Sequence, residues 1–150
     1  MVDFQPRFLT LLFMGTCMFV ASGSAFDVDG YFEESPFINK IATVFRKGQI
    51  PTKNNPRKLP RPDSGFVYMV SGTQEPDLSF QIVPALEFLS NYGKEFDRLK
   101  SLGVDSMLLD FGMEPQQNVE RRQYLPPNLI AAMSHFYMGL VFSTLKIPRG

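Results

Sequence analysis

The sequence predicts an α+β domain, in which a single layer of mainly antiparallel sheet carries two to three helices packed on one face. Short apolar runs typical of strands alternate with longer segments of helical periodicity. The 150 residues include 44% hydrophobic and 20% charged residues, which suits one globular domain. We expect this single α+β domain to span residues 16–147, after an N-terminal extension or signal-like segment over residues 1–15.

The N-terminal stretch has two interpretations. Residues 8–20 are mostly apolar, and small residues follow as far as Ala25, as at the end of a secretory signal peptide. Residues 17–22 can instead form a strand, with a turn at Gly23 and a helix capped by Asp27 or Asp29. The rest of the chain predicts a sheet that needs one more strand, so we favour the strand and a cytoplasmic protein. A secreted or periplasmic protein, with residues 26–150 as the mature chain, is the alternative.

The middle of the chain predicts a strand and then the longest helix. Residues 37–46 are apolar but ambiguous between helix and strand, whereas residues 64–71 predict an interior strand because both faces are apolar. Residues 78–102 have the periodicity of one helix. We expect its regular part to begin near Val83, because a helix tolerates a proline such as Pro84 only in its first turn. Its end is expected at the helix-capping Gly103. The inner face follows from apolar residues three or four apart: Ile82, Leu86, Leu89, Tyr92, Phe96 and Leu99.

The last third predicts a strand, a loop, a helix and a final strand. Residues 104–111 are the strand and residues 114–124 the polar loop. Pro126-Pro127 then opens a helix, since proline is allowed in the first turn. We expect this helix to end at Gly139 and the final strand to cover residues 140–145. The inner stripe of the helix is predicted to be Leu129, Met133 and Phe136.

A proline-rich loop over residues 48–63 lies within a cluster of basic residues. No acidic residue occurs between Glu34 and Asp63. Such a loop could contact phosphate or an acidic protein surface. We favour a solvated loop balanced by acidic neighbours, and nucleic acid is disfavoured because no aromatic residues interleave with the charges. The possible partner-binding residues are Arg46, Lys47, Lys53, Arg57, Lys58 and Arg61.

The sequence contains no convincing catalytic constellation. It has one histidine, His135, and one cysteine, Cys17, which is too few for a zinc site, and it lacks the common phosphate-binding motifs. Asp110-Phe111-Gly112 matches the magnesium-binding triplet of protein kinases, but without their other motifs Asp110 is predicted to be a strand-end carboxylate. No residue argues for an enzyme, a question that the sequence leaves open, and we expect no cofactor and no metal. A small hydrolase or nucleotide-binding enzyme that uses Asp110, His135 and Arg57 is an alternative.

Several short runs occur in an order that is similar to a family of small, uncharacterised bacterial proteins with a domain of unknown function. The runs are Ser22-Gly23, Phe26-Asp27-Val28-Asp29, Phe45-Arg46-Lys47-Gly48, Ser64-Gly65-Phe66, Leu109-Asp110-Phe111-Gly112 and Leu125-Pro126-Pro127-Asn128-Leu129. The resemblance implies a strand before Ser22 and, for some such domains, an immunity-type role beside a toxin. Together with the missing catalytic groups, it predicts a non-enzymatic domain that binds another macromolecule, expected to be a protein. A membrane partner is expected only if residues 8–20 act as a signal or an anchor.

Overall fold

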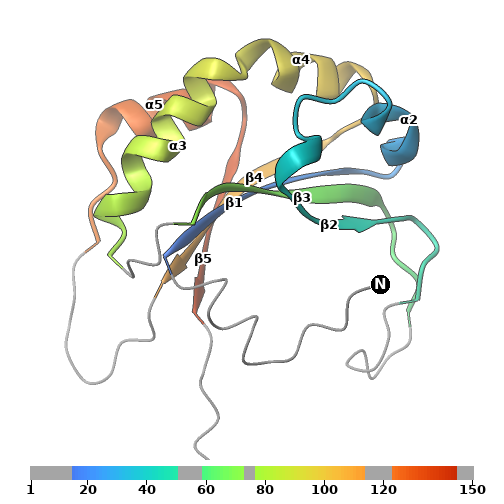
Figure 1. The fold of residues 1–150 in the computed structure, drawn as a ribbon, viewed down its shortest axis with the longest axis horizontal. Helices are drawn as coiled ribbons and strands as arrows, with labels where there is room; N and C mark the ends of the chain where they lie inside the picture. Colours follow the sequence, from blue (N-terminus) through green and yellow to red (C-terminus); the bar gives the residue numbers. More distant parts are fainter. Residues whose placement is uncertain (1–14, 51–58, 73–76, 114–122, 145–150) are drawn as a thin grey trace, which may run out of the picture.

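The structure, a computed structural model, describes residues 15–50, 59–72, 77–113 and 123–144. One five-stranded sheet carries its helices on one face (Figure 1), which confirms the predicted α+β class. The predicted extension, apart from Gly15, and the predicted domain end at residue 147 lie outside the described residues. The elements are β1 (Thr16–Gly23), α2 (Val28–Phe32), the 3-10 helix η1 (Ile38–Lys40), β2 (Ile41–Phe45), β3 (Ser64–Gly72), α3 (Ser79–Asn91), α4 (Gly93–Ser101), β4 (Ser106–Met113), α5 (Pro127–His135) and β5 (Gly139–Thr144).

The strand β1 is the centre of the sheet. It pairs antiparallel with β3 on one side and with β4 on the other, so that Val20 lies between Val67 and Leu108. Cys17, Phe19 and Ala21 face the helices and are completely buried. The prediction of a strand over residues 17–22 is therefore confirmed.

The strand order is β2-β3-β1-β4-β5. The first four strands are antiparallel and are connected as in the split βαβ arrangement of ferredoxin-like folds. The helix α5 then leads to β5, which pairs parallel with β4. Parallel neighbours need a crossover connection of this kind. The sheet is thus mainly antiparallel, as predicted, with one parallel pair at its edge.

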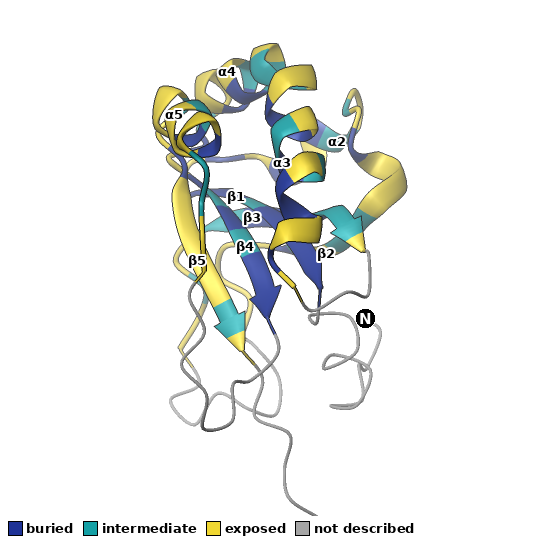
Figure 2. Cartoon of the chain, turned by 90° about the vertical axis from the view of Figure 1, so that its left-hand side faces the viewer, coloured by how far each residue is buried: buried dark blue, intermediate teal, exposed yellow. Residues whose placement is uncertain are grey.

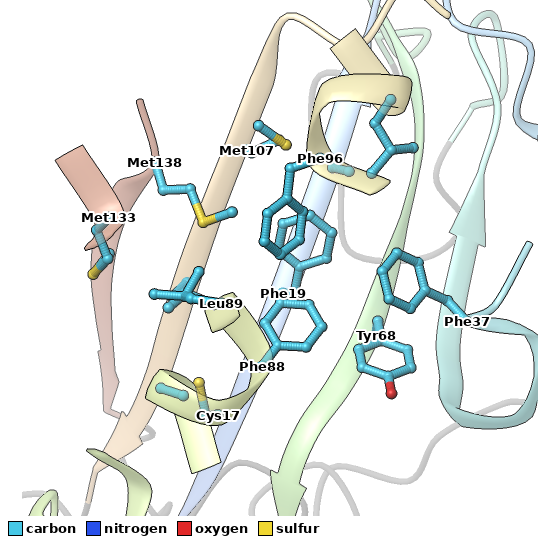
Figure 3. Packing of buried hydrophobic residues seen from close by; sticks show 14 of the residues in the cluster. Cys17, Phe19, Phe37, Tyr68, Phe88, Leu89, Phe96, Met107, Met133 and Met138 are labelled. Carbon is cyan, nitrogen blue, oxygen red and sulfur yellow. The ribbon is translucent and has the colours of Figure 1, made fainter. Parts of the chain in front are cut away.

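The core between sheet and helices is built from aromatic rings. The ring of Phe19 lies at its centre, with centroid distances of 6.0 Å to Phe37, 6.1 Å to Phe66, 5.2 Å to Phe88 and 5.4 Å to Phe96 (Figure 3). Each such ring contributes about 1.5–3 kcal/mol by its burial. The high phenylalanine content of the sequence therefore serves the packing between the sheet and its helices.

The single helix predicted over residues 78–102 is divided in the structure. The helix α3 already begins at Ser79, and Pro84 lies inside it. Leu78 and Gln81 are buried before the proline, and the backbone N–H of Ser79 donates a 3.0 Å hydrogen bond to the Asp77 carboxylate. These contacts stabilise the turn of α3 that precedes Pro84. The position of the proline alone predicts a later start of the helix.

The division between α3 and α4 lies where α5 approaches closely. At Tyr92 the backbone leaves helical geometry, with φ −117° and ψ 20°. A Cβ atom on Gly93 would lie 3.1 Å from the Phe136 ring, so glycine allows α5 to pack tightly here. The prediction of one continuous helix is therefore wrong.

Several local predictions are confirmed and others shift by a few residues. Gly103 has φ +102° after α4, and the Asp27 carboxylate accepts a 3.1 Å hydrogen bond from the Gly30 N–H at the start of α2. The ambiguous residues 37–46 form η1 and β2. Gly139 does not end a helix, because the turn after α5 is made by Tyr137 and Gly139 is already the first residue of β5.

Candidate functional site

The basic residues that the sequence suggested as a partner-binding loop are described only in part. Lys53, Arg57 and Lys58 lie outside the described residues. The Arg46 guanidinium donates to both oxygens of Asp29, with Nε–Oδ2 at 2.9 Å and Nη2–Oδ1 at 2.6 Å. This hydrogen bond holds the pKa of Asp29 below its ordinary range.

The other two described basic residues of this set also contact their own domain. The Arg61 guanidinium lies 4.6 Å from the centre of the Phe45 ring, and Lys47 Nζ donates to the carbonyl oxygen of Ser24 at 3.4 Å. Together with the Asp29 pair, these contacts favour the interpretation of a solvated loop with acidic neighbours. A partner-binding role of the basic loop stays a prediction.

Asp110 lies on the sheet face opposite the helices. It is the fifth of eight residues in β4, so its predicted place at the strand end is wrong. The Ser143 hydroxyl of β5 donates a 2.8 Å hydrogen bond to Asp110 Oδ2, while Oδ1 is buried without a hydrogen-bond partner. Burial raises the pKa of this carboxyl group above its ordinary value. The contact links β4 to β5, and it gives Asp110 a structural position.

The remaining candidate catalytic groups are separated in the structure. Cys17 lies in the core, where burial and then the nearby Asp110 charge raise the pKa of its thiol, so it is a neutral thiol at pH 7. His135 ends α5, with its ring against that of Phe136 at a centroid distance of 4.8 Å. Within the described ranges, no hydrogen bond joins His135 to Asp110, and no group of three His, Cys, Asp or Glu could hold a metal.

A polar cluster of Tyr31, Glu95 and Arg98 fastens α2 to α4. The Tyr31 hydroxyl donates to Glu95 Oε1 at 2.6 Å, and Arg98 donates to the same oxygen at 2.8 Å. Arg98 also donates to the carbonyl oxygen of Glu34 at 3.1 Å. Burial, and then the bond to Glu95, raises the pKa of the Tyr31 hydroxyl. Each of the three side chains is hydrogen-bonded to another of the three, so the cluster holds α2 against α4.

The strand β5 forms an exposed edge of the sheet. It pairs with β4 on one side, and no strand among the described residues covers its other side (Figure 2). Leu140, Val141 and Phe142 are 40%, 37% and 43% exposed. Such an edge presents unpaired N–H and C=O groups, and soluble proteins usually protect it with charges, proline or a bulge. β5 contains no charged residue and no proline, and its register with β4 is regular.

The opposite edge of the sheet is protected in the usual way. The register of β2 with β3 shifts between Ile41 and Thr43, which marks an irregularity in this short strand. Arg46 and Lys47 follow directly after it. The two edges of the same sheet therefore differ, and β5 is the one open to pairing.

An exposed tyrosine lies just before the open edge. Tyr137 is 87% exposed and has φ +55°, a left-handed backbone that costs an L residue about 1–2 kcal/mol. It occupies the position after α5 where glycine is usual, and the Met138 N–H closes the turn by donating to the Met133 carbonyl at 2.9 Å. Strained backbone recurs at functional sites, so Tyr137 belongs with the open strand in the candidate site. We call Tyr137, Leu140, Val141 and Phe142 the β5 edge patch.

The sequence predicts a final strand but does not show that this strand is an edge of the sheet. Apolar residues on both faces, as in Leu140, Val141 and Phe142, also occur in the interior strand β3. The available signal was the absence of any charge from residue 139 to residue 144. That signal becomes informative only when the strand order is known.

Comparisons with protein-family models, with curated proteins and with solved structures found no match to this chain. The resemblance to a bacterial family of unknown function therefore stays a prediction. None of the helices in the described part of the chain is long and apolar enough to cross a membrane.

Proposed function

We propose that this chain is a non-enzymatic protein-binding domain and that it binds through the β5 edge patch. The observation that supports the proposal is the open edge strand, which is uncharged, regular and apolar on both faces. A protein with such an edge gains from pairing it, because the alternative is an exposed template for aggregation.

The proposed mode of binding is the addition of a partner strand to the sheet. Main-chain hydrogen bonds along β5 would supply affinity, and side chains on alternating faces would supply specificity. The register with β4 places Leu140 and Phe142 on the helix side, beside Leu109 and Phe111. Val141 lies on the other side, beside Asp110. A partner strand would therefore bury apolar groups on both faces of the sheet.

The immunity-type role implied by the family resemblance is a narrower form of this proposal, in which the partner is a toxin. The binding-competent domain contains β1, because β3 and β4 both pair with that strand. We therefore propose that the active form retains residue 16 onward, in keeping with a cytoplasmic protein. Residues 26–150 alone would lack the central strand.

Affinity capture from the cells that naturally produce the protein tests the proposal. The baits are the tagged full chain, Val141→Lys in the open edge and Thr43→Lys in the protected edge as the matched control. We expect the unchanged chain and T43K to retain another protein in a stoichiometric amount. A second copy of this chain, recognised by a different tag, counts as such a protein. V141K should lose that protein by about tenfold or more, or about 1.4 kcal/mol, because a lysine in the middle of an edge strand replaces an apolar contact with a charge that an added strand would have to desolvate. Circular dichroism checks that both variants are folded.

Two results would contradict the proposal. One is the absence of any stoichiometric protein, a second copy included, on all three baits. The other is a partner that V141K retains as fully as T43K does, since the binding surface would then lie elsewhere.

A further inference from the structure

We infer that the strand added to β5 is the β5 strand of a second copy of this chain. Two copies would then form a dimer with a two-fold axis and one continuous sheet, made from two five-stranded halves. This inference rests on the proposed function and names its partner.

The charges of the two sheet edges favour pairing of like with like at β5. Because β5 has no charged residue, two copies can approach along this edge without like-charge repulsion. Two β2 edges paired antiparallel about Thr43 would instead bring Arg46 of one copy opposite Lys40 of the other, at both ends of the pair. Pairing of β5 with β2 would leave one free edge at each end, so copies would add without limit. Of the pairings that use β5, only β5 with β5 closes after two copies.

The pleat of the strand restricts the register of this pair. Directly opposed residues of antiparallel strands lie on the same face of the sheet. An even-numbered residue of one copy must therefore oppose an even-numbered residue of the other, and an odd-numbered residue an odd-numbered one. If Val141 meets the Val141 of the second copy, each Leu140 lies opposite a Phe142 on the helix side. The two Leu140–Phe142 pairs would then extend the core beyond Phe111, whose ring centroid already lies 6.2 Å from that of Phe142.

The neighbouring register is less favourable. If Phe142 meets itself, Leu140 lies opposite Thr144 and Val141 opposite Ser143, so that apolar side chains meet hydroxyl groups. The register centred on Val141 pairs more apolar surface and is the one we infer.

The size of the contact predicts a moderate affinity. One short strand per copy buries less than the roughly 800 Å² per partner of a standard stable interface, although the exposed Tyr137 rings add surface at both ends of the pair. We therefore expect a dissociation constant on the order of micromolar. The association should be visible as a mass that depends on protein concentration.

Sedimentation of the full chain from roughly 1 to 100 µM tests the inference. We expect the mass to rise from 17.0 kDa toward twice this value, and the T43K control to behave in the same way. V141K should remain a monomer over the whole range. Tyr137 is kept in all of these variants, so that only the edge is changed.

A second variant tests the register and does not depend on V141K being folded. In Val141→Cys the two-fold axis places the introduced thiols opposite each other, at a separation that a disulfide can bridge. Added oxidised glutathione accepts the two electrons and two protons that the thiols lose, and a covalent dimer should form. Thr43→Cys is the matched control and should form no covalent dimer under the same oxidation, although it still associates through β5, while the native Cys17 is buried.

The outcomes separate this inference from the proposed function. Concentration-dependent dimerisation, its loss in V141K and cross-linking in V141C support the second copy. A chain that is monomeric at about 100 µM, or a dimer that V141K leaves intact, overturns it. If the chain is monomeric while affinity capture recovers a different protein that V141K loses, the inference fails and the proposed function stands.

Discussion

The Ser143 hydroxyl donates a 2.8 Å hydrogen bond to the Asp110 carboxylate and so joins the open edge strand β5 to β4. The second carboxylate oxygen is buried without a hydrogen-bond partner. A charged group in this position loses solvation that one hydroxyl does not replace, which is why the pKa of Asp110 is raised. The proposed binding edge therefore carries a titratable contact in addition to its regular pairing with β4.

The first prediction concerns the pH dependence of stability at Asp110. Between the ordinary pKa of 3.8 and the raised pKa of the folded state, the folded chain binds more protons at this group than the unfolded chain. The contribution of Asp110 to the free energy of unfolding is therefore fully present below pH 3.8 and falls as the pH rises through the raised pKa. Asp110→Asn removes the titration, so the unchanged chain should lose stability relative to D110N over this window. Urea unfolding of both chains from about pH 3.5 to pH 7 measures the difference.

Ser143→Ala is the control for this prediction. It removes one hydrogen bond and should lower the free energy of unfolding by about 1 kcal/mol at neutral pH. Because burial is the main cause of the raised pKa, S143A should keep the pH-dependent difference from D110N. A difference that is flat with pH, or that has the opposite sign, would show that Asp110 is not desolvated in the folded chain.

The second prediction is that Tyr137→Gly stabilises the fold. Glycine adopts φ +55° without steric cost, whereas the tyrosine carries left-handed strain. The greater freedom of glycine in the unfolded chain and the loss of the Lys100 contact, 5.2 Å from the ring centroid, offset part of the gain. We expect a net gain of about 0.5–1 kcal/mol in the free energy of unfolding, measured by thermal or urea unfolding.

The matched control for Y137G is Tyr124→Gly, which removes another exposed tyrosine. Tyr124 is 73% exposed, and its φ is not positive. This variant should not be stabilised, because no left-handed strain is relieved. If Y137G also weakened capture of the partner, the exposed ring would be part of the binding surface and its strain would have a function.

Local chemistry in the sequence was sufficient to predict most of the fold. Periodicity located the strands, Gly103 marked the end of a helix, and Asp27 marked the start of another. These features depend on a few neighbouring residues. The prediction of a strand over residues 17–22 needed more, because it followed from a sheet that lacked one strand, and the central position of β1 confirms it.

The errors in the sequence analysis arise where distant segments meet. The break at Tyr92 lies beside the contact of Gly93 with Phe136, more than forty residues away along the chain. The candidate site was missed for the same reason. An interior strand such as β3 and an edge strand such as β5 can both be apolar on both faces, and only the strand order distinguishes them.

The third prediction concerns the glycine of the Ser22-Gly23 run. A Cβ atom on Gly23 would collide with the carbonyl oxygen of Gly103, where the end of β1 meets the turn after α4. Backbone atoms cannot move aside as a side-chain end can, so Gly23→Ala should lower the free energy of unfolding by about 3 kcal/mol. Urea unfolding measures this loss.

Gly72→Ala is the control at another strand end. Its added Cβ would meet only the Met69 sulfur, at 3.1 Å, and that flexible side chain can shift. We expect a change of less than about 1 kcal/mol. Equal losses in G23A and G72A would mean that the close approach of Gly23 to Gly103 is not what requires glycine there.

The last prediction is that a chain of residues 26–150 does not fold. It lacks β1, which pairs with both β3 and β4 and places Phe19 among four other phenylalanine rings. Burial of the large apolar side chains of this central strand contributes about 1.5–3 kcal/mol each, and their sum is comparable with the 5–15 kcal/mol net stability of a typical domain. The shortened chain should show no cooperative unfolding and little amide dispersion in its NMR spectrum. A chain that begins at Met14 keeps every described residue and should unfold cooperatively, as the full chain does. If residues 26–150 folded and captured the same partner, the central place of β1 in the binding-competent domain would be wrong.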